Sequence, residues 1–208
     1  VRLILKYLKT RVFFDTLLCF GLLNIGLMLS VQAQDSARVI RTLNISYFGK
    51  SVTRPGIKIG PDIVLRNFLL HHAKKVKSTV LQFVLLPNSG IYYHFHNHLG
   101  VFINSEIGLR ATYSNGFLWQ FAFGAGYMRT FLVAKVYKVN EEGEVERIHL
   151  AGNNQFMPDA SITLGKSYPG NARTVKSYFA RIGGFLQYPF NTMWLPNITL
   201  EIGTSINL

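Results

Sequence analysis

Cysteine is almost absent from this sequence of 208 residues, which contains Cys19 and no other. A disulfide within the chain is therefore excluded, because it needs two thiols. Cys19 lies in an apolar run and follows Leu18 instead of a small residue, so its surroundings do not resemble a lipidation site. The rest of the chain has no thiol, which suits an exported bacterial protein in an oxidising compartment.

Charged residues are also scarce. They make up 15% of the sequence, against about a quarter in soluble domains. Basic residues outnumber acidic ones by 22 to 10, so the formal net charge of +12 suggests an anionic partner. We expect no nucleic-acid binding, because the basic residues are scattered through apolar segments and no nucleic-acid motif is present. Anionic lipid head groups remain a candidate partner, beside the simpler interpretation of solvated charge.

The N-terminal segment has the pattern of a signal peptide. A basic region precedes an apolar run at 12–29, and Ala33 provides a small residue where a signal peptidase would cut. We predict a signal peptide over 1–33 and one domain over 34–208. A retained membrane anchor is the alternative, since about 18 apolar residues just span a bilayer. Asp15 and Asn24 interrupt the run and favour the signal peptide.

Helical periodicity is lacking from Ala37 onward, and the chain alternates instead in the manner of strands. The clearest case is 197–208, where Ile198, Leu200 and Ile202 share an apolar face opposite a polar one. An unpaired strand edge is a liability, so this strand needs a neighbour on each side. We therefore expect it to close a barrel against an earlier strand.

Seven earlier segments alternate in the same way. The total of about eight strands is the smallest common size for a membrane barrel. Asn115 and Gly116 favour a tight hairpin, since they supply the positive φ of primed turns. Pro61 predicts a bulge or kink, and Pro87 a break or bulge. The expected strands cover 39–48, 57–66, 79–86 with a continuation at 91–95, 101–112, 117–131, 156–166, 177–188 and 197–208.

The two faces of these strands decide the fold class. One face is rich in glycine and carries both signs of charge, which suits the narrow interior of an eight-stranded barrel. The other carries long aliphatic and aromatic groups, as lipid contact requires. We predict an all-β, antiparallel, up-and-down transmembrane β-barrel; a soluble periplasmic β-barrel that binds a small apolar ligand is the alternative. The predicted interior charges are Asp62, Glu106, Asp159, Glu201, Lys58, Arg66, Arg110 and Arg181, and the predicted aromatic girdles contain Tyr92, Tyr93, Trp119, Tyr127, Tyr178, Tyr188 and Trp194.

Connection lengths agree with a barrel whose last strand ends at the periplasm. Outer-membrane barrels pair short periplasmic turns with longer external loops. The shortest connection, 113–116, is then periplasmic, and the longest, 132–155, is external and has the pattern of a projecting hairpin. The connection 167–176 fits less well, because it is long for a periplasmic turn.

This pattern resembles the small outer-membrane β-barrel proteins of Gram-negative bacteria. The resemblance covers 39–208 and includes the phrases 93–98, YHFHNH, and 187–191, QYPFN. It implies a location in the outer membrane, insertion by the barrel-insertion machinery and contact with outer-membrane lipid, but no set biochemical activity. Members of this family usually end on an aromatic residue, whereas this chain ends on Leu208.

The residues that could carry chemistry are few. His94, His96 and His98 would point to one side of an extended segment, about 7 Å apart, and could surround Zn²⁺ or Cu²⁺. Only these three ligands are visible, so we favour polar groups at the membrane interface and predict no metal and no cofactor. Glu106, Arg110, Glu201 and Arg181 are expected to form a structural network inside the barrel, because unpaired charges there would be costly.

A catalytic set of His94, Ser105 and Glu106 can be assembled on paper. Ser105 and Glu106 fall on opposite faces of their strand, however, so we predict no catalytic residue. The predicted function is that of a non-enzymatic outer-membrane protein, structural or surface-ligand-binding through its external loops. The alternative is a lipid-modifying enzyme, and a pore is a weaker idea. Lys74, Lys75 and Lys77 form a solvated turn or contact anionic lipid.

Overall fold

The structure is a computed structural model that describes residues 42–51, 53–71, 78–95, 97–139, 143–148, 150–168, 175–190 and 193–207. These residues belong to one compact unit, Val39–Leu208. Within them, no helix has the length and hydropathy that a membrane span requires. The predicted signal peptide, the three lysines at 74, 75 and 77, and His96 lie outside the described residues.

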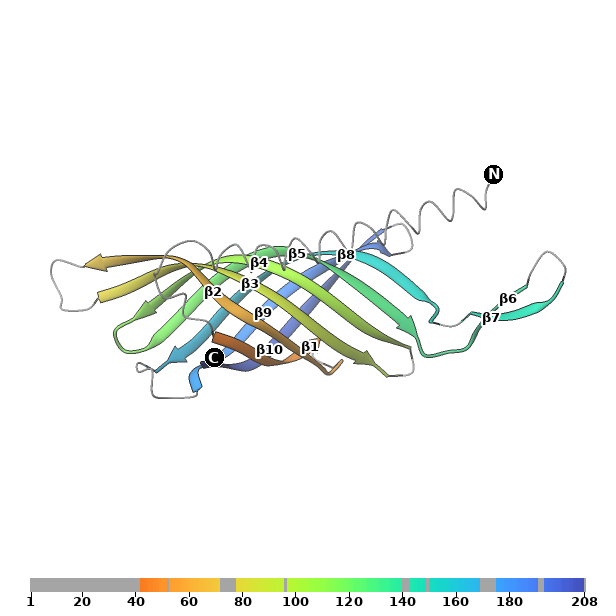
Figure 1. The fold of residues 1–208 in the computed structure, drawn as a ribbon, viewed down its shortest axis with the longest axis horizontal. Coiled ribbons are helices and arrows are strands. Elements are labelled where there is room, and N and C mark those ends of the chain that lie inside the picture. The colour runs from red at the N-terminus through yellow and green to blue at the C-terminus, as the bar shows by residue number, and fades with distance from the viewer. Residues whose placement is uncertain are drawn as a thin grey trace. The chain divides into compact units, whose positions relative to one another are not determined.

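Eight antiparallel strands form a closed barrel (Figure 1). Each strand pairs with the next one along the ring, and the last pairs with the first. The prediction of an all-β, up-and-down ring of eight strands is therefore confirmed. The strands are β1 (Thr42–Lys50), β2 (Gly56–His71), β3 (Ser78–His94), β4 (His98–Tyr113), β5 (Phe117–Leu132), β8 (Gly152–Ser167), β9 (Val175–Phe190) and β10 (Met193–Asn207).

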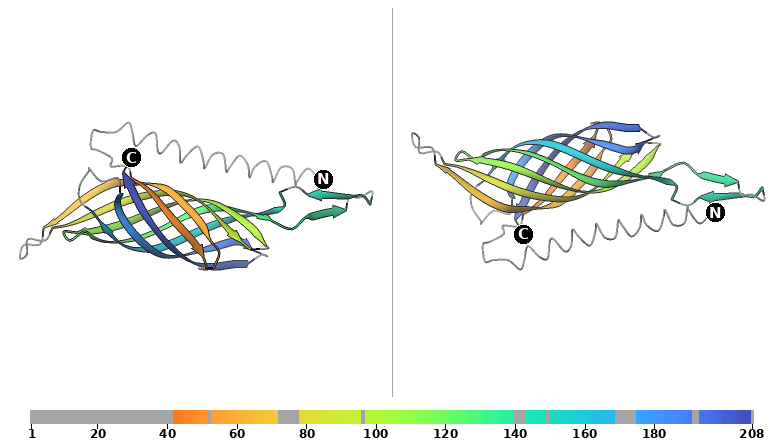
Figure 2. Two further views of the ribbon diagram at one scale, coloured as in Figure 1. Left: turned by 90° about the horizontal axis from the view of Figure 1, so that it is seen from below. Right: turned by 90° about the horizontal axis from the view of Figure 1, so that it is seen from above.

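Two further strands, β6 (Val136–Val139) and β7 (Val145–Ile148), form a separate two-stranded sheet between β5 and β8. Figure 2 shows this hairpin projecting beyond one end of the ring. The prediction of a hairpin in the longest connection is confirmed. We call the end of the ring that carries it the loop end, and the end at the 113–116 turn the turn end.

Closure of the ring rests on β1 and β10, which pair from Thr42↔Asn207 to Lys50↔Thr199. The expected need of the last strand for two neighbours is thus met, with β9 on its other side. The strand begins at Met193, earlier than predicted, because Met193 pairs with Phe190 across the preceding turn.

The two prolines lie opposite each other in β2 and β3. Register places Pro61 across from Pro87, where the β2–β3 ladder is interrupted between Ile59 and Ile63. Each proline lacks the N–H that a ladder bond needs, and pairing them confines the loss to one site. The predicted break of β3 at Pro87 does not occur, since the strand continues to His94.

A bulge in β2 changes which residues face inward. The register between β2 and β3 shifts between Val64 and Arg66. An extra residue in one strand reverses the alternation of side chains beyond it. Arg66 is consequently exposed and lies over the Phe68 ring, 5.1 Å from its centroid. Its predicted place inside the barrel was wrong.

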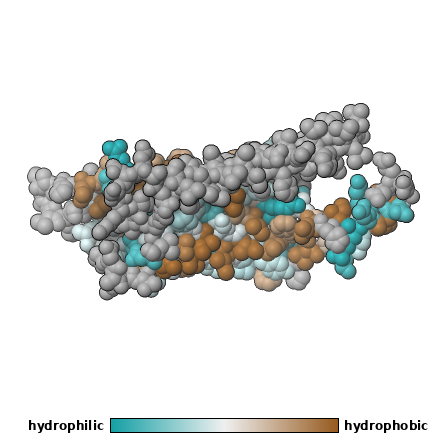
Figure 3. Space-filling model, viewed as in Figure 1, coloured by the Kyte–Doolittle hydropathy of each residue, from teal (hydrophilic) through white to brown (hydrophobic). Residues whose placement is uncertain are grey.

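The faces of the ring are distributed as predicted, with polar groups inside and apolar groups outside. In β1, Thr42, Asn44 and Ser46 are buried, whereas Ile45 and Tyr47 are exposed. Buried polar and charged residues outnumber buried hydrophobic ones among the described residues. Figure 3 shows apolar side chains along the visible outer face of the ring and hydrophilic ones on the hairpin.

Candidate functional site

The centre of the ring is crossed by a layer of four charged side chains. Lys58 Nζ lies 2.9 Å from Glu106 Oε1 and 3.1 Å from Glu201 Oε1. Arg181 Nη1 lies 3.5 Å from Glu201 Oε2 and 3.8 Å from Glu106 Oε1. The four residues come from β2, β4, β9 and β10, and all are almost fully buried. We call this group the ionic layer; its formal charges cancel.

The ionic layer differs from the predicted network in one member. Glu106, Glu201 and Arg181 are brought together as expected, but Lys58 stands where Arg110 was predicted. Arg110 lies four residues along β4 from Glu106, about 13 Å at the rise of a strand. Its Nη2 pairs with Asp62 Oδ2 at 2.5 Å. Strand alternation gives the facing direction of a side chain but not its partner across the ring.

Neutral side chains donate further hydrogen bonds to the buried carboxylates. Ser161 Oγ donates to Glu106 Oε2 at 3.0 Å, and Asn88 Nδ2 donates to Glu106 Oε1 at 3.3 Å. Asn104 Nδ2 donates to Asp159 Oδ2 at 2.7 Å, while Asp159 Oδ1 has no hydrogen-bond partner within the described protein. A cavity of about 20 Å³ lies beside these residues, which is room for a single water.

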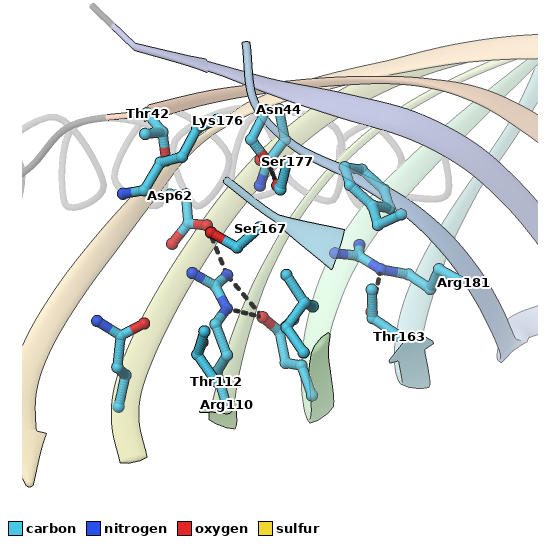
Figure 4. Close-up of a pocket in the computed structure, with 15 residues that line it drawn as sticks. Thr42, Asn44, Asp62, Arg110, Thr112, Thr163, Ser167, Lys176, Ser177 and Arg181 are labelled. Carbon is cyan, nitrogen blue, oxygen red and sulfur yellow. Dashed lines mark hydrogen bonds and ion pairs between the residues drawn. The ribbon is translucent and has the colours of Figure 1, made fainter. Parts of the chain in front are cut away.

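A larger polar pocket of about 40 Å³ lies toward the turn end (Figure 4). Arg110, Asp62 and Lys176 line it, and the Arg110 guanidinium is fixed by Nε and Nη2 bonds of 2.8 and 2.6 Å to Gln120 Oε1. Gln120 Nε2 and Asp62 Oδ1 are buried there without a hydrogen-bond partner among the described groups. The volume suits about three waters and is too small for an acyl chain.

Toward the loop end the interior becomes aromatic around one lysine. Lys50 is buried, and its Nζ donates to Tyr92 Oη at 3.1 Å and to Gln187 Oε1 at 2.9 Å. The same ammonium lies 4.7 Å from the Tyr92 ring centroid and 5.4 Å from that of Phe185. No carboxylate of the described residues forms an ion pair with it. The surrounding cluster contains Phe48, Tyr92, Phe102, Met128, Met157 and Phe185.

Tyr92 was wrongly predicted to lie in an outer girdle. It is 1% exposed and fills the ring, because β3 turns Val84, Leu86 and Tyr92 to the inside. Gly100 on the neighbouring strand makes room for it, since a Cβ there would overlap the Tyr92 ring. The predicted interior glycines thus leave space for large inward-facing aromatic rings as well as for charged side chains. The other predicted girdle residues are partly or well exposed on the outside, and Tyr188 stacks on Trp194 at 4.6 Å.

His94 and His98 do not lie along one extended segment. They face each other across a hairpin turn, with ring centroids 5.1 Å apart, because the chain reverses between them. His98 Nε2 lies 3.1 Å from Tyr92 Oη. The predicted geometry with three imidazoles on one side of a strand was wrong; His96 is outside the described residues. Among those described, no group of three or more His, Cys, Asp or Glu could hold a metal ion.

The structure does not bring together His94, Ser105 and Glu106, the hypothetical catalytic set. Ser105 and Glu106 alternate on β4, and Glu106 is engaged in the ionic layer. His94 pairs with His98, eight residues from Glu106 and about 27 Å along the strand. Comparisons with protein-family models, curated proteins and solved structures find no match. A functional proposal for this chain must therefore rest on the geometry of the structure.

Proposed function

We propose that this chain is a non-enzymatic outer-membrane β-barrel protein that presents the β6–β7 hairpin as its surface-binding element. The observation that carries the proposal is the reversed distribution of polarity. Ile182, Ile198 and Ile202 are each more than 60% exposed on the outside, whereas the four charges of the ionic layer are buried. Burying a side chain of this size is worth about 1.5–3 kcal/mol, so water is a poor solvent for this surface and lipid a good one.

The height of the apolar surface fits a bilayer. On β5 the outward residues from Phe117 to Tyr127 are apolar or aromatic, and Arg129 is the first charge beyond them. Ten steps of about 3.3 Å span about 33 Å, which becomes about 25 Å at a strand tilt of about 40°. Outer-membrane barrels carry an apolar band about 25 Å tall. On β9, Tyr178 and Tyr188 bracket a stretch of the same length.

Within the described residues, the interior favours neither a ligand-binding barrel nor an open pore. A soluble carrier of apolar ligands needs an apolar cavity of several hundred Å³. The two described cavities measure about 40 and 20 Å³; the larger is lined mainly by polar and charged residues, and the smaller by charged and aromatic ones together. The ionic layer contributes to both linings, and side chains of the aromatic cluster line the smaller cavity. The lipid-modifying alternative has no observation in its favour, because its three residues are separated.

The hairpin supports the binding role. Its cross-strand pairs Lys138↔Glu146 and Tyr137↔Arg147 place charged and aromatic groups in solvent. Both of its outer edges are open in the described structure, and an open strand edge can accept an extended partner segment. A two-stranded sheet of this size gains little from its own packing, so it is an adaptable element on a rigid ring.

Fractionation and heat-modified gel mobility test the membrane assignment. We expect the protein in isolated outer membranes, and an unboiled band that migrates differently from the boiled one because a closed barrel resists detergent. Release in the soluble periplasmic fraction, without a mobility shift, would overturn the proposal. Replacing 134–150 by a short turn should leave the shift intact and abolish binding of a surface ligand; a variant that loses the shift would instead make the hairpin part of the fold.

A further inference from the structure

Resting on the membrane assignment proposed above, we propose that Arg129 binds the phosphate of an anionic lipid at the loop end of the ring. Arg129 points outward on β5, two residues beyond Tyr127. It is the first charged outward residue past the apolar band, so it lies at the depth of the lipid head groups. A guanidinium at this depth presents a planar fork of donors that matches phosphate oxygens.

Neighbouring side chains hold this guanidinium in place. Asn154 lies directly across from Arg129 on β8, and its Oδ1 accepts a 2.9 Å bond from Arg129 Nη1. The same oxygen accepts a 2.6 Å bond from Tyr127 Oη. Arg129 Cζ also lies 5.2 Å from the Phe131 ring centroid. One amide oxygen and one ring therefore orient the fork without neutralising it.

No carboxylate on the described strands of the ring faces outward beside Arg129, which leaves the site to an external anion. The ring carboxylates within the described residues are Asp62, Glu106, Asp159 and Glu201, and the alternation of their strands turns all of them inward. Arg129 has no ion pair among the described residues. An outer wall that carries basic groups and no acid is complementary to phosphate and repels no anionic head group.

The opposite end of the ring supplies an independent check on depth. Lys166 is exposed on β8 and pairs with Phe117 and Tyr178, the residues that begin the apolar band. Asn154 and Lys166 are twelve residues apart on one strand, about 40 Å along it and about 30 Å across a bilayer at a tilt of about 40°. Outward cations thus mark both borders of the band, as phosphate contacts would require.

The test measures lipid retention by the folded protein. The protein is reconstituted in phosphatidylcholine that contains a minor fraction of phosphatidylglycerol, and bound phosphatidylglycerol is quantified by native mass spectrometry. Arg129→Gln should weaken retention of this lipid about fivefold, the effect of one basic group at a membrane surface. Arg147→Gln, which removes the same charge from the projecting hairpin, should change it less than about twofold.

A second variant keeps the test informative if Arg129→Gln folds poorly. Asn154→Asp places a carboxylate against the guanidinium, so it should preserve the ring and still reduce retention of phosphatidylglycerol. Inorganic phosphate should not displace the lipid; displacement would assign the site to free anion and overturn a lipid site. Equal retention by wild type, Arg129→Gln and Asn154→Asp would also overturn it. Failure of the wild-type protein to insert into any bilayer would overturn the membrane assignment instead.

Discussion

Lys58 and Lys50 are both buried in the same ring, yet their surroundings differ. Lys58 contacts two carboxylates and belongs to a neutral group of four charges. Among the described groups, the Lys50 ammonium contacts neutral oxygens and two aromatic rings. The comparison shows two ways to keep an ammonium inside a narrow barrel, by ion pairing at the centre and by hydrogen bonds and cation–π contacts near the loop end. The same substitution at the two sites should therefore have very different costs.

Lys58→Met should have the largest effect. Among the described residues it leaves Glu106 and Glu201 with Arg181 as their one paired cation, and an uncompensated buried charge costs about 3–5 kcal/mol. We expect the free energy of unfolding in lipid vesicles to fall by about that amount. Urea titration followed by the fluorescence of the outward Trp119 and Trp194 measures it.

A double variant separates lost charge from lost packing. Lys58→Met combined with Glu106→Gln leaves Arg181 and Glu201 as a neutral pair, so it should be more stable than Lys58→Met alone. A double variant that is less stable than the single one would show that packing, not charge balance, governs this layer.

Gly100→Ala should have an intermediate effect, because it acts on the neutral surroundings of Lys50. The added methyl group overlaps the Tyr92 ring, which must move away from the ammonium. Overpacking of this kind costs about 1–3 kcal/mol. Gly184→Ala is a suitable control, since a Cβ added at Gly184 would have one described atom within 4 Å, the Asn197 carbonyl oxygen at 3.1 Å. Equal losses of unfolding free energy in the two variants would contradict the role given to Gly100.

The alternation of residues was sufficient to predict the number of strands, their order around the ring and the inward direction of Lys58, Glu106 and Glu201. The prediction failed where a bulge or a turn changes which face of the sheet the following side chains point to. The bulge before Arg66 moved that side chain outside, and the turn between His94 and His98 replaced a straight segment by a facing pair. Neither event leaves a periodic signal, because each is local to a single residue or turn.

Partners inside the ring could not be predicted from the sequence. Arg110 and Lys58 are both inward cations, but Arg110 shares β4 with Glu106 and is separated from it by spacing along that strand, whereas the register between strands brings Lys58 to Glu106. That register depends on pairing between segments far apart in the chain, such as β1 with β10. The place of Tyr92 was missed for a related reason, since the space left by Gly100 belongs to another strand.

Lys50→Met should have the smallest effect, and it gives the comparison its sharpest form. The substitution removes a buried charge that has no counter-ion among the described residues, while the methionine side chain retains contact with the Tyr92 and Phe185 rings. Both oxygens that lose the ammonium keep a partner: Gln187 Oε1 accepts from Asn197 Nδ2 at 3.0 Å, and Tyr92 Oη lies 3.1 Å from His98 Nε2. No orphaned group remains, so the large penalty expected for Lys58→Met has no cause here.

We expect the unfolding free energy of Lys50→Met to lie within about 1 kcal/mol of the wild-type value, because lost hydrogen bonds and cation–π contacts offset the relief of burying a charge. The same urea titration in vesicles measures it beside Lys58→Met. A loss of about 3 kcal/mol or more would mean that Lys50 is paired with an anion in the folded protein. The loop end would then hold charge in the same way as the ionic layer, and the difference between the two lysines would disappear.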